Sequence, residues 1–490
     1  MSNVRTRVHI VIDDREFTSG EVRSVVGARR YGDISLKRRL LIDHLRSAVP
    51  EWARPQTYHI RHQGDLDALR ERLINSAEQG SVLLIAGRAA FAQASHLTQL
   101  IERLPYAEED FTDRMYKPLL VFMHEAHQLV EKWPHLEKKP VHQWDSPWVD
   151  RPRLQSVTPM DLSTIRDFLA FTTGTTAARH FNEMEIDGYY YTKRSSDKRK
   201  MLAEYSFYQM VPETMRPWLV QTFDYRDEGG RASYKMMRYY LPDAAVQWVH
   251  GAFGLESFDA FIDRLLFFLA QRPRRACSPA ESAQAAKRLF LDKTQDRLEA
   301  FMNDPNGRRV NDLVASSNSA LDSRRQMERF ARLYARHEAS FAMDHAVIGH
   351  GDPCLSNILY DQQRYLLKLI DPKGANTESE LWTHPLYDLC KISHSLLGDY
   401  DFINNGRYRI DFSDQNELLL IVHHTNHEAL KRQFSDKIKT MGFKRQIMRL
   451  GEAALFLSML PLHLDYPNKV MAFMLRANQI LDEVESGNEA

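Results

Sequence analysis

The sequence predicts an α/β domain at the N-terminus, followed by a larger α+β domain whose C-terminal part is mostly helical. Short apolar runs alternate with amphipathic segments over residues 1–133, as in successive strand and helix units. Prolines and tryptophans then crowd a polar stretch at 134–158, which suppresses regular structure and indicates a connector. A strand-rich stretch follows at 159–242, and most of 243–490 has helical periodicity.

The composition is that of a globular protein with more than one domain. The chain has 490 residues, of which 43% are hydrophobic and 27% charged. Lys plus Arg equals Asp plus Glu at 65 each, so no global field would draw the protein onto nucleic acid, and basic runs such as 272–275 are interpreted as solvated. No apolar stretch approaches the roughly 20 residues of a membrane span. We therefore expect a cytoplasmic protein with no membrane or nucleic-acid partner, whose oligomeric state is left open.

The three cysteines indicate neither a disulfide framework nor a zinc site. Cys277, Cys354 and Cys390 show no C-x-x-C spacing. We expect them to be reduced.

Three apolar runs predict the strands of the first domain: Val8–Asp13, Ser81–Ala86 and Pro118–Met123. Each precedes a segment with helical periodicity, which favours a mainly parallel sheet. The acidic pair Asp13 and Asp14 after the first run could hold a metal, but a solvated turn is the favoured interpretation.

The most informative stretch is HGDPCLSNIL at 350–359. Asp352 precedes Asn357 by five residues, which is the spacing of a loop whose carboxylate accepts a substrate proton and whose amide oxygen ligates a metal. The apolar segments that follow predict a hairpin, which would deliver Asp371 to the same place. One Asn and one Asp are a normal protein complement for Mg²⁺ beside phosphates. This pattern predicts phosphoryl transfer from ATP, with Asp352 as base and Asn357 and Asp371 as Mg²⁺ ligands.

A purely structural interpretation of these residues is the alternative. An Asx turn at Asp352 and a helix-capping Asp371 would explain either residue singly, but not both spacings with a hairpin between them. His350, in the same loop, is expected to hold the backbone by hydrogen bonding and not to transfer protons.

The pattern H-G-D-x-x-x-x-N-I-L, followed by an apolar strand and I-D, resembles the motif pair of the aminoglycoside phosphotransferase and choline kinase superfamily. The segment PLYDLCK at 385–391 is similar to the P-x-Y-D-L-A segment of the same superfamily, in which Asp388 would be a buried support of the catalytic loop. The resemblance covers residues 155–460. It implies a two-lobed protein-kinase-like domain with an N-lobe at 159–242, a helical C-lobe at 243–490, ATP and Mg²⁺ as cofactors, and a small-molecule hydroxyl as acceptor.

The nucleotide lobe should contain a lysine and a glutamate that pair. Gly188–Lys193 alternates as a strand and ends on a lysine placed like the phosphate-pairing lysine of kinases. The helix that follows carries Glu204 where the pairing glutamate is expected. We predict a Lys193–Glu204 ion pair; the alternative is a solvated charged face with Lys198 and Lys200 as competing partners.

Two further segments are candidates for contacts with the nucleotide. TTGTTAARHF at 172–181, which includes Gly174 and Thr175, is small and polar enough to close over phosphates, although an ordinary turn between strands is the alternative. The segment 234–239 resembles the strand-to-hinge passage whose backbone would contact adenine, with Met237 near its centre. A plain core strand is the competing interpretation.

Shorter segments resemble kinase-like proteins associated with capsule and other surface-polysaccharide biosynthesis, in which a sugar-nucleotidyltransferase-like domain often comes first. These segments are Ala178–Asn182, Lys193–Ser195, Ala203–Tyr208 and Tyr387–Ser395. Val26–Leu45 is similar to nucleotidyltransferase openings, but it lacks a G-x-G-T-R loop, and Gly87-Arg88 stands where a metal-binding Asp would be expected. The resemblance therefore implies a degenerate nucleotidyltransferase-like domain at 1–133 that binds or scaffolds.

Two functions follow from these patterns. The first is an active kinase for a small molecule, such as a sugar or amino alcohol used in surface-polysaccharide biosynthesis; the second is a catalytically inactive kinase-like scaffold or nucleotide-binding module. The presence of Asp352, Asn357, Asp371 and Lys193 together favours the enzyme, because a scaffold has no chemical need for all four. A kinase acting on protein is disfavoured because the segment between Asp371 and Pro385 is short for a peptide-docking platform.

The acceptor and the choice between ATP and GTP are left open by the sequence. Acidic and aromatic residues of the helical region could line an acceptor pocket or face solvent; these are Asp399, Tyr400, Asp401 and Asp465.

Overall fold

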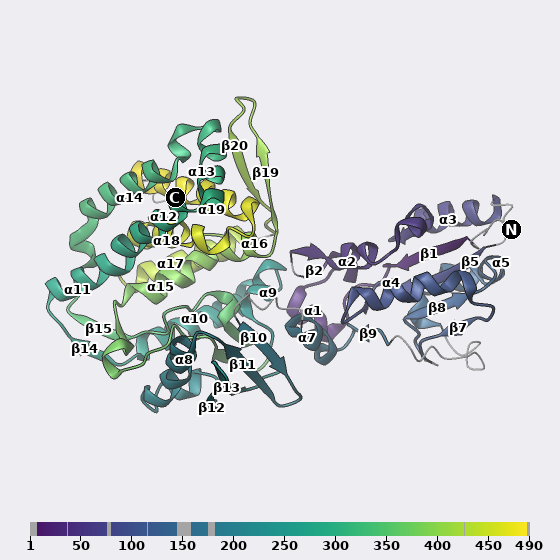
Figure 1. Cartoon of the computed structure of the whole chain (residues 1–490), viewed down its shortest axis with the longest axis horizontal. Coiled ribbons are helices and arrows are strands. Elements are labelled where there is room, and N and C mark those ends of the chain that lie inside the picture. Colours follow the sequence, from purple (N-terminus) through teal and green to yellow (C-terminus); the bar gives the residue numbers. More distant parts are fainter. Residues whose placement is uncertain are drawn as a thin grey trace. The chain divides into compact units, whose positions relative to one another are not determined.

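The computed structural model describes residues 7–36, 38–75, 80–114, 116–144, 158–174, 182–425 and 427–487. The chain forms two compact units, residues 1–177 and 178–490 (Figure 1). Each unit has a hydrophobic core of its own. Within the described residues, no helix is both long and apolar enough to cross a membrane.

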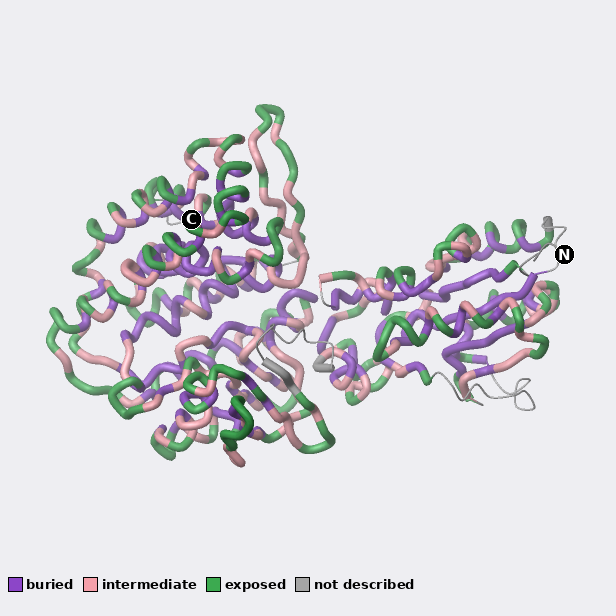
Figure 2. The backbone as a smooth tube through the Cα atoms, viewed as in Figure 1, coloured by how far each residue is buried: buried purple, intermediate pink, exposed green. Residues whose placement is uncertain are grey.

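The first unit is built on a five-stranded sheet in the order β4-β1-β5-β8-β7. Strand β1 (Val8–Asp13) pairs in parallel with β4 (Thr57–Ile60) and β5 (Ser81–Ala86). The third expected strand, β8 (Leu120–Met123), runs antiparallel to β5, as does β7 (Phe111–Thr112) to β8. Every residue of β1 and β5 is buried (Figure 2), which is why these strands are continuous apolar runs in the sequence.

Short helices and strands complete this unit. They are α1 (Gly20–Val26), β2 (Ser35–Leu36), β3 (Arg39–Leu40), α2 (Leu41–Ser47), α3 (Gln63–Asn75), β6 (Ala89–Ala90), α4 (Ala94–Arg103), α5 (His127–Glu131), α6 (Trp133–Lys138), β9 (Met160–Asp161) and α7 (Ile165–Gly174).

The first unit extends past the boundary that the prolines indicate. Helix α6 extends into the expected connector at 134–158, and its residue Leu136 is buried in the core of the unit together with Trp133. Pro134 does not prevent this, because it occupies the first turn of α6, where a helix has no intrahelical partner for the N–H group. Strand β9 pairs with β6, and α7 contacts α1, so residues 159–174 belong to the first unit and not to the expected N-lobe.

The acidic pair after β1 is buried, so the expected solvated turn is wrong. Asp13 accepts two hydrogen bonds from the Arg15 guanidinium, at 2.7 and 2.8 Å. Asp14 accepts the backbone N–H of Gly32 at 2.8 Å and lies 3.1 Å from His59 Nε2. Both carboxylates are therefore bound by groups of the fold itself.

The second unit begins with a small lobe, residues 182–242, built on a four-stranded antiparallel sheet in the order β10-β11-β13-β12. Helix α8 contacts strands β12 and β13. It begins after Asp197, whose side chain accepts the N–H of Lys200 and caps the helix. The elements are β10 (Asn182–Ile186), β11 (Tyr190–Ser195), α8 (Lys198–Met210), β12 (Thr222–Glu228) and β13 (Arg231–Met237).

The large lobe of the second unit is mostly helical, as predicted. Its central helix α18 is buried on all sides from residue 447 to residue 459. The helices are α9 (Ala244–Val249), α10 (Leu255–Gln271), α11 (Pro279–Ala286), α12 (Lys293–Asn303), α13 (Pro305–Ser317), α14 (Ser323–His337), α15 (Leu386–Leu396), α16 (Tyr400–Asn404), α17 (His427–Thr440), α18 (Arg445–Met459) and α19 (Pro467–Ser486).

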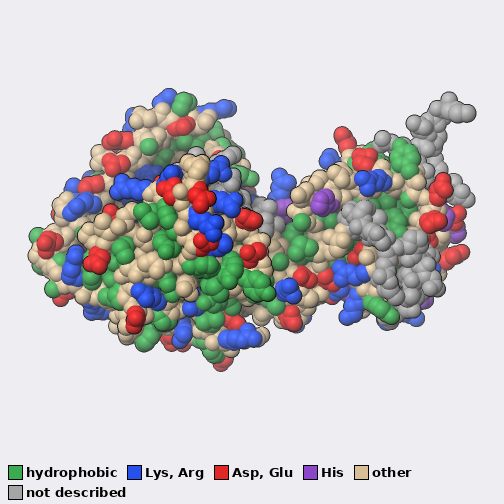
Figure 3. Space-filling view, turned by 60° about the horizontal axis from the view of Figure 1, so that its bottom comes forward, with side chains coloured by type: hydrophobic (Ala, Val, Ile, Leu, Met, Phe, Trp, Pro, Cys, Tyr) green, Lys and Arg blue, Asp and Glu red, His purple; other side chains and the backbone are tan. Residues whose placement is uncertain are grey.

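Short strands connect these helices. They are β14 (Arg274–Ala276), β15 (His345–Ile348), β16 (Ile358–Asp361), β17 (Leu366–Leu369), β18 (Trp382–Thr383), β19 (Tyr408–Phe412) and β20 (Leu418–Val422). On the face drawn in Figure 3, basic and acidic side chains are interspersed, in keeping with their equal totals.

Candidate active site

The loop that follows β15 brings the predicted base and the predicted amide ligand together. The Nδ2 atom of Asn357 donates to the backbone oxygen of Asp352 at 2.9 Å, across the five-residue spacing seen in the sequence. With its nitrogen engaged in this way, the Asn357 amide presents its oxygen as the remaining polar atom. The Asp352 side chain is 41% exposed, so its carboxylate is accessible to a substrate.

The predicted hairpin places Asp371 next to this loop. Strands β16 and β17 are antiparallel, and the N–H of Ile370 donates to Asn357 O at 3.0 Å, immediately before Asp371. Asp371 has a φ of 54°, in the left-handed region that Asp and Asn tolerate better than most residues. Strained backbone of this kind is concentrated at functional sites.

The predicted ion pair between Lys193 and Glu204 is present, and it extends to Asp371. Lys193 Nζ lies 2.7 Å from Glu204 Oε2 and 3.1 Å from Asp371 Oδ1. Tyr234 Oη also donates to Glu204 Oε2, at 2.8 Å, whereas the competing Lys200 is 3.7 Å from Glu204. Burial alone would lower the pKa of Lys193, but Asp371 and Glu204 raise it above its ordinary value. Lys193 is therefore a cation at neutral pH.

Two glycines with positive φ allow the segments of the site to approach one another. At Gly351, with a φ of 83°, an added Cβ would lie 2.5 Å from Lys373 Cβ. At Gly374, with a φ of 84°, it would lie 2.5 Å from the carbonyl carbon of Ala203 on α8. The segment after β17 is thus in close contact both with the loop that follows β15 and with α8.

The Asp388 carboxylate and the His350 ring both bind the backbone of the loop that follows β15. The buried Asp388 carboxylate accepts the N–H groups of His350 at 2.9 Å and Gly351 at 2.8 Å, and it pairs with Arg272 at 2.8 Å. His350 Nδ1 accepts the N–H of Asp352 at 3.3 Å. Burial lowers the pKa of His350, so the ring is neutral and available as an acceptor.

Two cations of the site were not found from the sequence. Lys391 Nζ lies 3.0 Å from Asp352 Oδ1, and Arg272, expected to be solvated, is buried against Asp388. A signal for Lys391 was available: it follows Asp388 by three residues on a predicted helix, so both lie on one face. Nothing in the local sequence of Arg272 indicates a buried partner more than a hundred residues away.

The other candidates for contacts with the nucleotide lie on separate elements of the chain. Gly174 is the last residue of α7 in the first unit, so 172–174 is a helix end and not a turn between strands. Thr175 lies outside the described residues. Met237 is the last residue of β13, and its N–H donates to Gln221 O at 3.2 Å, so this donor is already used within the protein.

The candidates for an acceptor pocket differ in their surroundings. Asp399 is buried and pairs with Arg476, Lys431 and His424, which is a structural arrangement. Tyr400 and Asp401 are also buried, and burial raises the pKa of Asp401 to about 7. Asp465 is exposed. These residues therefore do not form one surface.

A scan against protein-family models and a search of curated proteins found no match. The solved structures similar to this chain include an apo thermostable mutant of aminoglycoside phosphotransferase APH(4)-Ia, with 12% identity, a TM-score of 0.38 and coverage of 66% of this chain and 100% of that one. An N203A mutant of this thermostable protein, in a ternary complex with AMP-PNP and hygromycin B, has 13% identity, a TM-score of 0.40 and coverage of 66% and 99%.

An aminoglycoside-3'-phosphotransferase of type VIII has 11% identity and a TM-score of 0.33 over 57% of this chain and 94% of that one. The structural neighbours are thus aminoglycoside phosphotransferases.

Proposed function

We propose that the second unit is an ATP- and magnesium-dependent phosphotransferase that acts on a hydroxyl group of a small molecule. The observation that carries this proposal is the convergence of Lys193, Asp352, Asn357 and Asp371. Asn357 contacts Asp352 at 2.9 Å, and Lys193 contacts Asp371 at 3.1 Å. The hairpin β16–β17 connects these two pairs. Phosphoryl transfer needs these parts and little else: a cation for the phosphates, a carboxylate for the attacking hydroxyl, and oxygen ligands for a metal.

The donor set fits Mg²⁺. Among the described residues, no group of three His, Cys, Asp or Glu side chains could hold a metal ion. Asn357 and Asp371 offer an amide oxygen and a carboxylate, and Mg²⁺ commonly takes one or two protein ligands and completes its shell with phosphate oxygens and water. Magnesium bound there would neutralise charge on the phosphates.

The roles of the other residues follow from their positions. Asp352 would accept the proton of the acceptor hydroxyl, because its carboxylate is exposed beside the loop that carries Asn357. Lys193, fixed by Glu204, would bind phosphate oxygens with an ammonium group that stays charged. His350 and Asp388 would hold the loop without contacting the substrate.

A sugar or an amino alcohol used in surface-polysaccharide biosynthesis is the acceptor we propose, on the resemblance of the short segments such as 203–208 and 387–395. The first unit would be a degenerate nucleotidyltransferase-like module that binds or scaffolds. In support, Arg88 stands where a metal-binding carboxylate is expected, and it pairs with Glu16 at 3.1 Å and Asp161 at 3.0 Å. A buried cation at this position opposes metal binding.

The experiment that tests the proposal is a screen of sugars and amino alcohols for acceptor-dependent formation of ADP from MgATP, with Asp352→Asn as a matched blank. We expect at least one acceptor to stimulate ADP formation by the wild type and not by the variant. If no acceptor does so, the alternative of an inactive kinase-like scaffold is favoured. If the variant responds as the wild type does, the protein is a phosphotransferase but Asp352 is not its base.

A further inference from the structure

Helix α15 contacts the catalytic loop along one face. Three side chains at positions i, i+3 and i+7 form this face: Asp388, Lys391 and Ser395. Their partners along the loop are, in order, the N–H groups of His350 and Gly351, the Oδ1 atom of Asp352 at 3.0 Å, and the N–H of Leu355 at 3.1 Å. The helix therefore contacts the loop at several points between residues 350 and 355, and Lys391 is the member of the face that contacts the proposed base.

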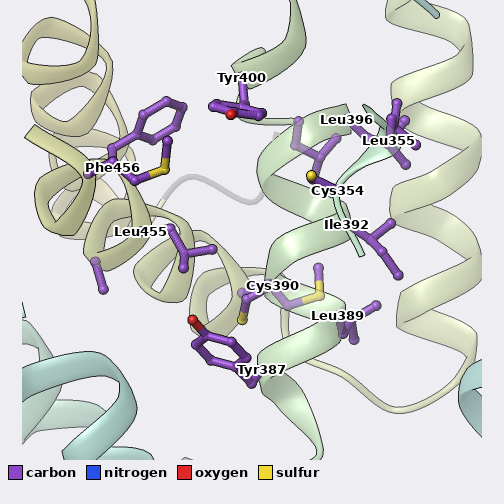
Figure 4. Close-up of a cluster of buried hydrophobic side chains, with 14 of the residues drawn as sticks. Cys354, Leu355, Tyr387, Leu389, Cys390, Ile392, Leu396, Tyr400, Leu455 and Phe456 are labelled. Atoms are coloured by element: carbon purple, nitrogen blue, oxygen red, sulfur yellow. The ribbon is translucent and has the colours of Figure 1, made fainter. Parts of the chain in front are cut away.

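The rest of α15 is fixed in the hydrophobic core. Its buried side chains lie with Leu455 and Phe456 of α18 in one cluster (Figure 4), and α15 packs along α18. At Gly451 of α18, an added Cβ would lie 2.4 Å from Cys390 Sγ, which shows how closely the two helices approach. Lys391 is thus presented by a rigid element, which holds a functional side chain more accurately than a loop does.

The loop itself supplies no cation next to the base. The residues between Asp352 and Asn357 are Pro, Cys, Leu and Ser. The Lys391 side chain is 14% exposed, and burial alone would lower its pKa, but Asp352 and Tyr387 raise the pKa above its ordinary value. An ammonium group is therefore kept charged beside an accessible carboxylate.

The position of this ammonium determines what else it can contact. A base must lie about 3 Å from the hydroxyl oxygen that it deprotonates, and that oxygen must approach the phosphorus to about 3–3.5 Å. A lysine bound to the base at 3.0 Å is consequently within reach of the oxygens of the transferring group. Its three N–H donors allow it to bind the carboxylate and a phosphate oxygen together.

We propose that Lys391 holds Asp352 in place and binds the γ-phosphoryl group of ATP. In the transfer, the acceptor oxygen forms a bond to the γ-phosphorus, and the bond between this phosphorus and the bridging oxygen breaks, with its electron pair leaving on ADP. The hydroxyl proton passes to Asp352, while Lys391 keeps its protons and its charge. This inference rests on the proposed phosphotransferase function and adds a γ-phosphate ligand from outside the catalytic loop.

The test compares nucleotides with and without a γ-phosphate and needs no acceptor. Calorimetry would measure the affinities of the full-length protein for Mg²⁺ complexes of AMP-PNP and ADP. Lys391→Met, which keeps the packed stem, should weaken AMP-PNP binding by about 10-fold and ADP binding by less than about 2-fold, since a charge-assisted bond to the γ-phosphate is lost. Lys391→Arg should restore much of the AMP-PNP affinity, and Lys391→Gln should behave like the Met variant.

Lys293 offers a matched control, because it donates to Tyr387 Oη of α15 at 2.8 Å, whereas the lysine that pairs with Asp352 is Lys391. Lys293→Met should leave both affinities unchanged. If Lys391→Met binds AMP-PNP as the wild type does, or loses ADP to the same extent, this inference is wrong while the proposed function stands. If the wild type binds neither nucleotide, both are wrong.

Discussion

The two units of this chain place pairs of aspartates in opposite environments. Asp13 and Asp14, at the end of strand β1 in the first unit, have side chains that are 0% and 1% exposed. Asp352 and Asp371, in the loops around the hairpin β16–β17 of the second unit, are 41% and 36% exposed. All four lie close to a cationic or ionisable side chain, so proximity to a partner does not distinguish the two pairs.

Access to a substrate is what separates them. Asp13 binds the Arg15 guanidinium through both oxygens and also accepts the N–H of Val141, so its lone pairs serve the fold. Asp352 and Asp371 each contact a lysine and retain exposed surface. The same residue type is therefore structural in one unit and suited to chemistry in the other, and its environment decides the role.

The largest difference should appear in turnover. Asp352→Asn should lower the rate of phosphoryl transfer by about 10²–10⁴-fold, because it removes the base, with little change in nucleotide affinity. Asp13→Asn should leave the rate within about 2-fold of the wild type. Steady-state kinetics with an identified acceptor measures both, and equal loss in the two variants would contradict the separation of roles.

For stability, the larger effect should come from the first unit. Asp13→Asn should lower the free energy of unfolding by about 3 kcal/mol, because it breaks a largely buried ion pair and leaves the Arg15 guanidinium without its charge partner. Asp371→Asn should cost less than about 1 kcal/mol, since its carboxylate is substantially exposed and Asn tolerates the same positive φ. Urea unfolding measures both values. Comparable losses would contradict the claim that Asp13, and not Asp371, serves mainly to stabilise the fold.

A smaller effect on stability should come from His384, a buried histidine of the second unit. Burial lowers the pKa of His384 to about 4, while Nε2 contacts Phe341 O at 2.8 Å and Nδ1 accepts the N–H of Leu386 at 3.3 Å. The pKa of His384 in the folded protein lies below the unfolded value of 6.5. The contribution of this residue to the free energy of unfolding is therefore complete above about pH 6.5 and is lost as the pH falls towards 4.

Between pH 7 and pH 5 we expect this histidine to reduce the free energy of unfolding by about 2 kcal/mol. His384→Gln should remove that part of the pH dependence, as measured by urea unfolding at a series of pH values. An unchanged slope in the variant would show that His384 does not titrate in this way.

The parts of the site that the sequence predicts are those fixed by local geometry. Asp352 and Asn357 lie on one loop, Asp371 follows from the hairpin, and the Lys193–Glu204 pair joins a strand to the helix directly after it. In each case, short spacing and a regular element determine the position.

The residues that were missed or misjudged depend on distant parts of the chain. Arg272 is buried by Asp388 from another helix, and Lys391 contacts a loop that precedes it by almost forty residues. Asp13 and Asp14 were expected in solvent, but Arg15 and the N–H of Gly32 bind them once the chain closes around β1. The local sequence does not predict such contacts, because tertiary packing determines which side chains are buried.

The central claim, that Asn357 and Asp371 form a magnesium site for ATP, is tested most directly by the melting temperature with ATP in the presence of Mg²⁺ or EDTA. We predict a larger rise with Mg²⁺ for the wild type. The difference should be lost in Asp371→Asn and kept in Asp361→Asn, a control at the other end of the hairpin, where Asp361 accepts the N–H groups of Gln363 and Arg364. Equal stabilisation of the wild type by ATP in both buffers would contradict the account.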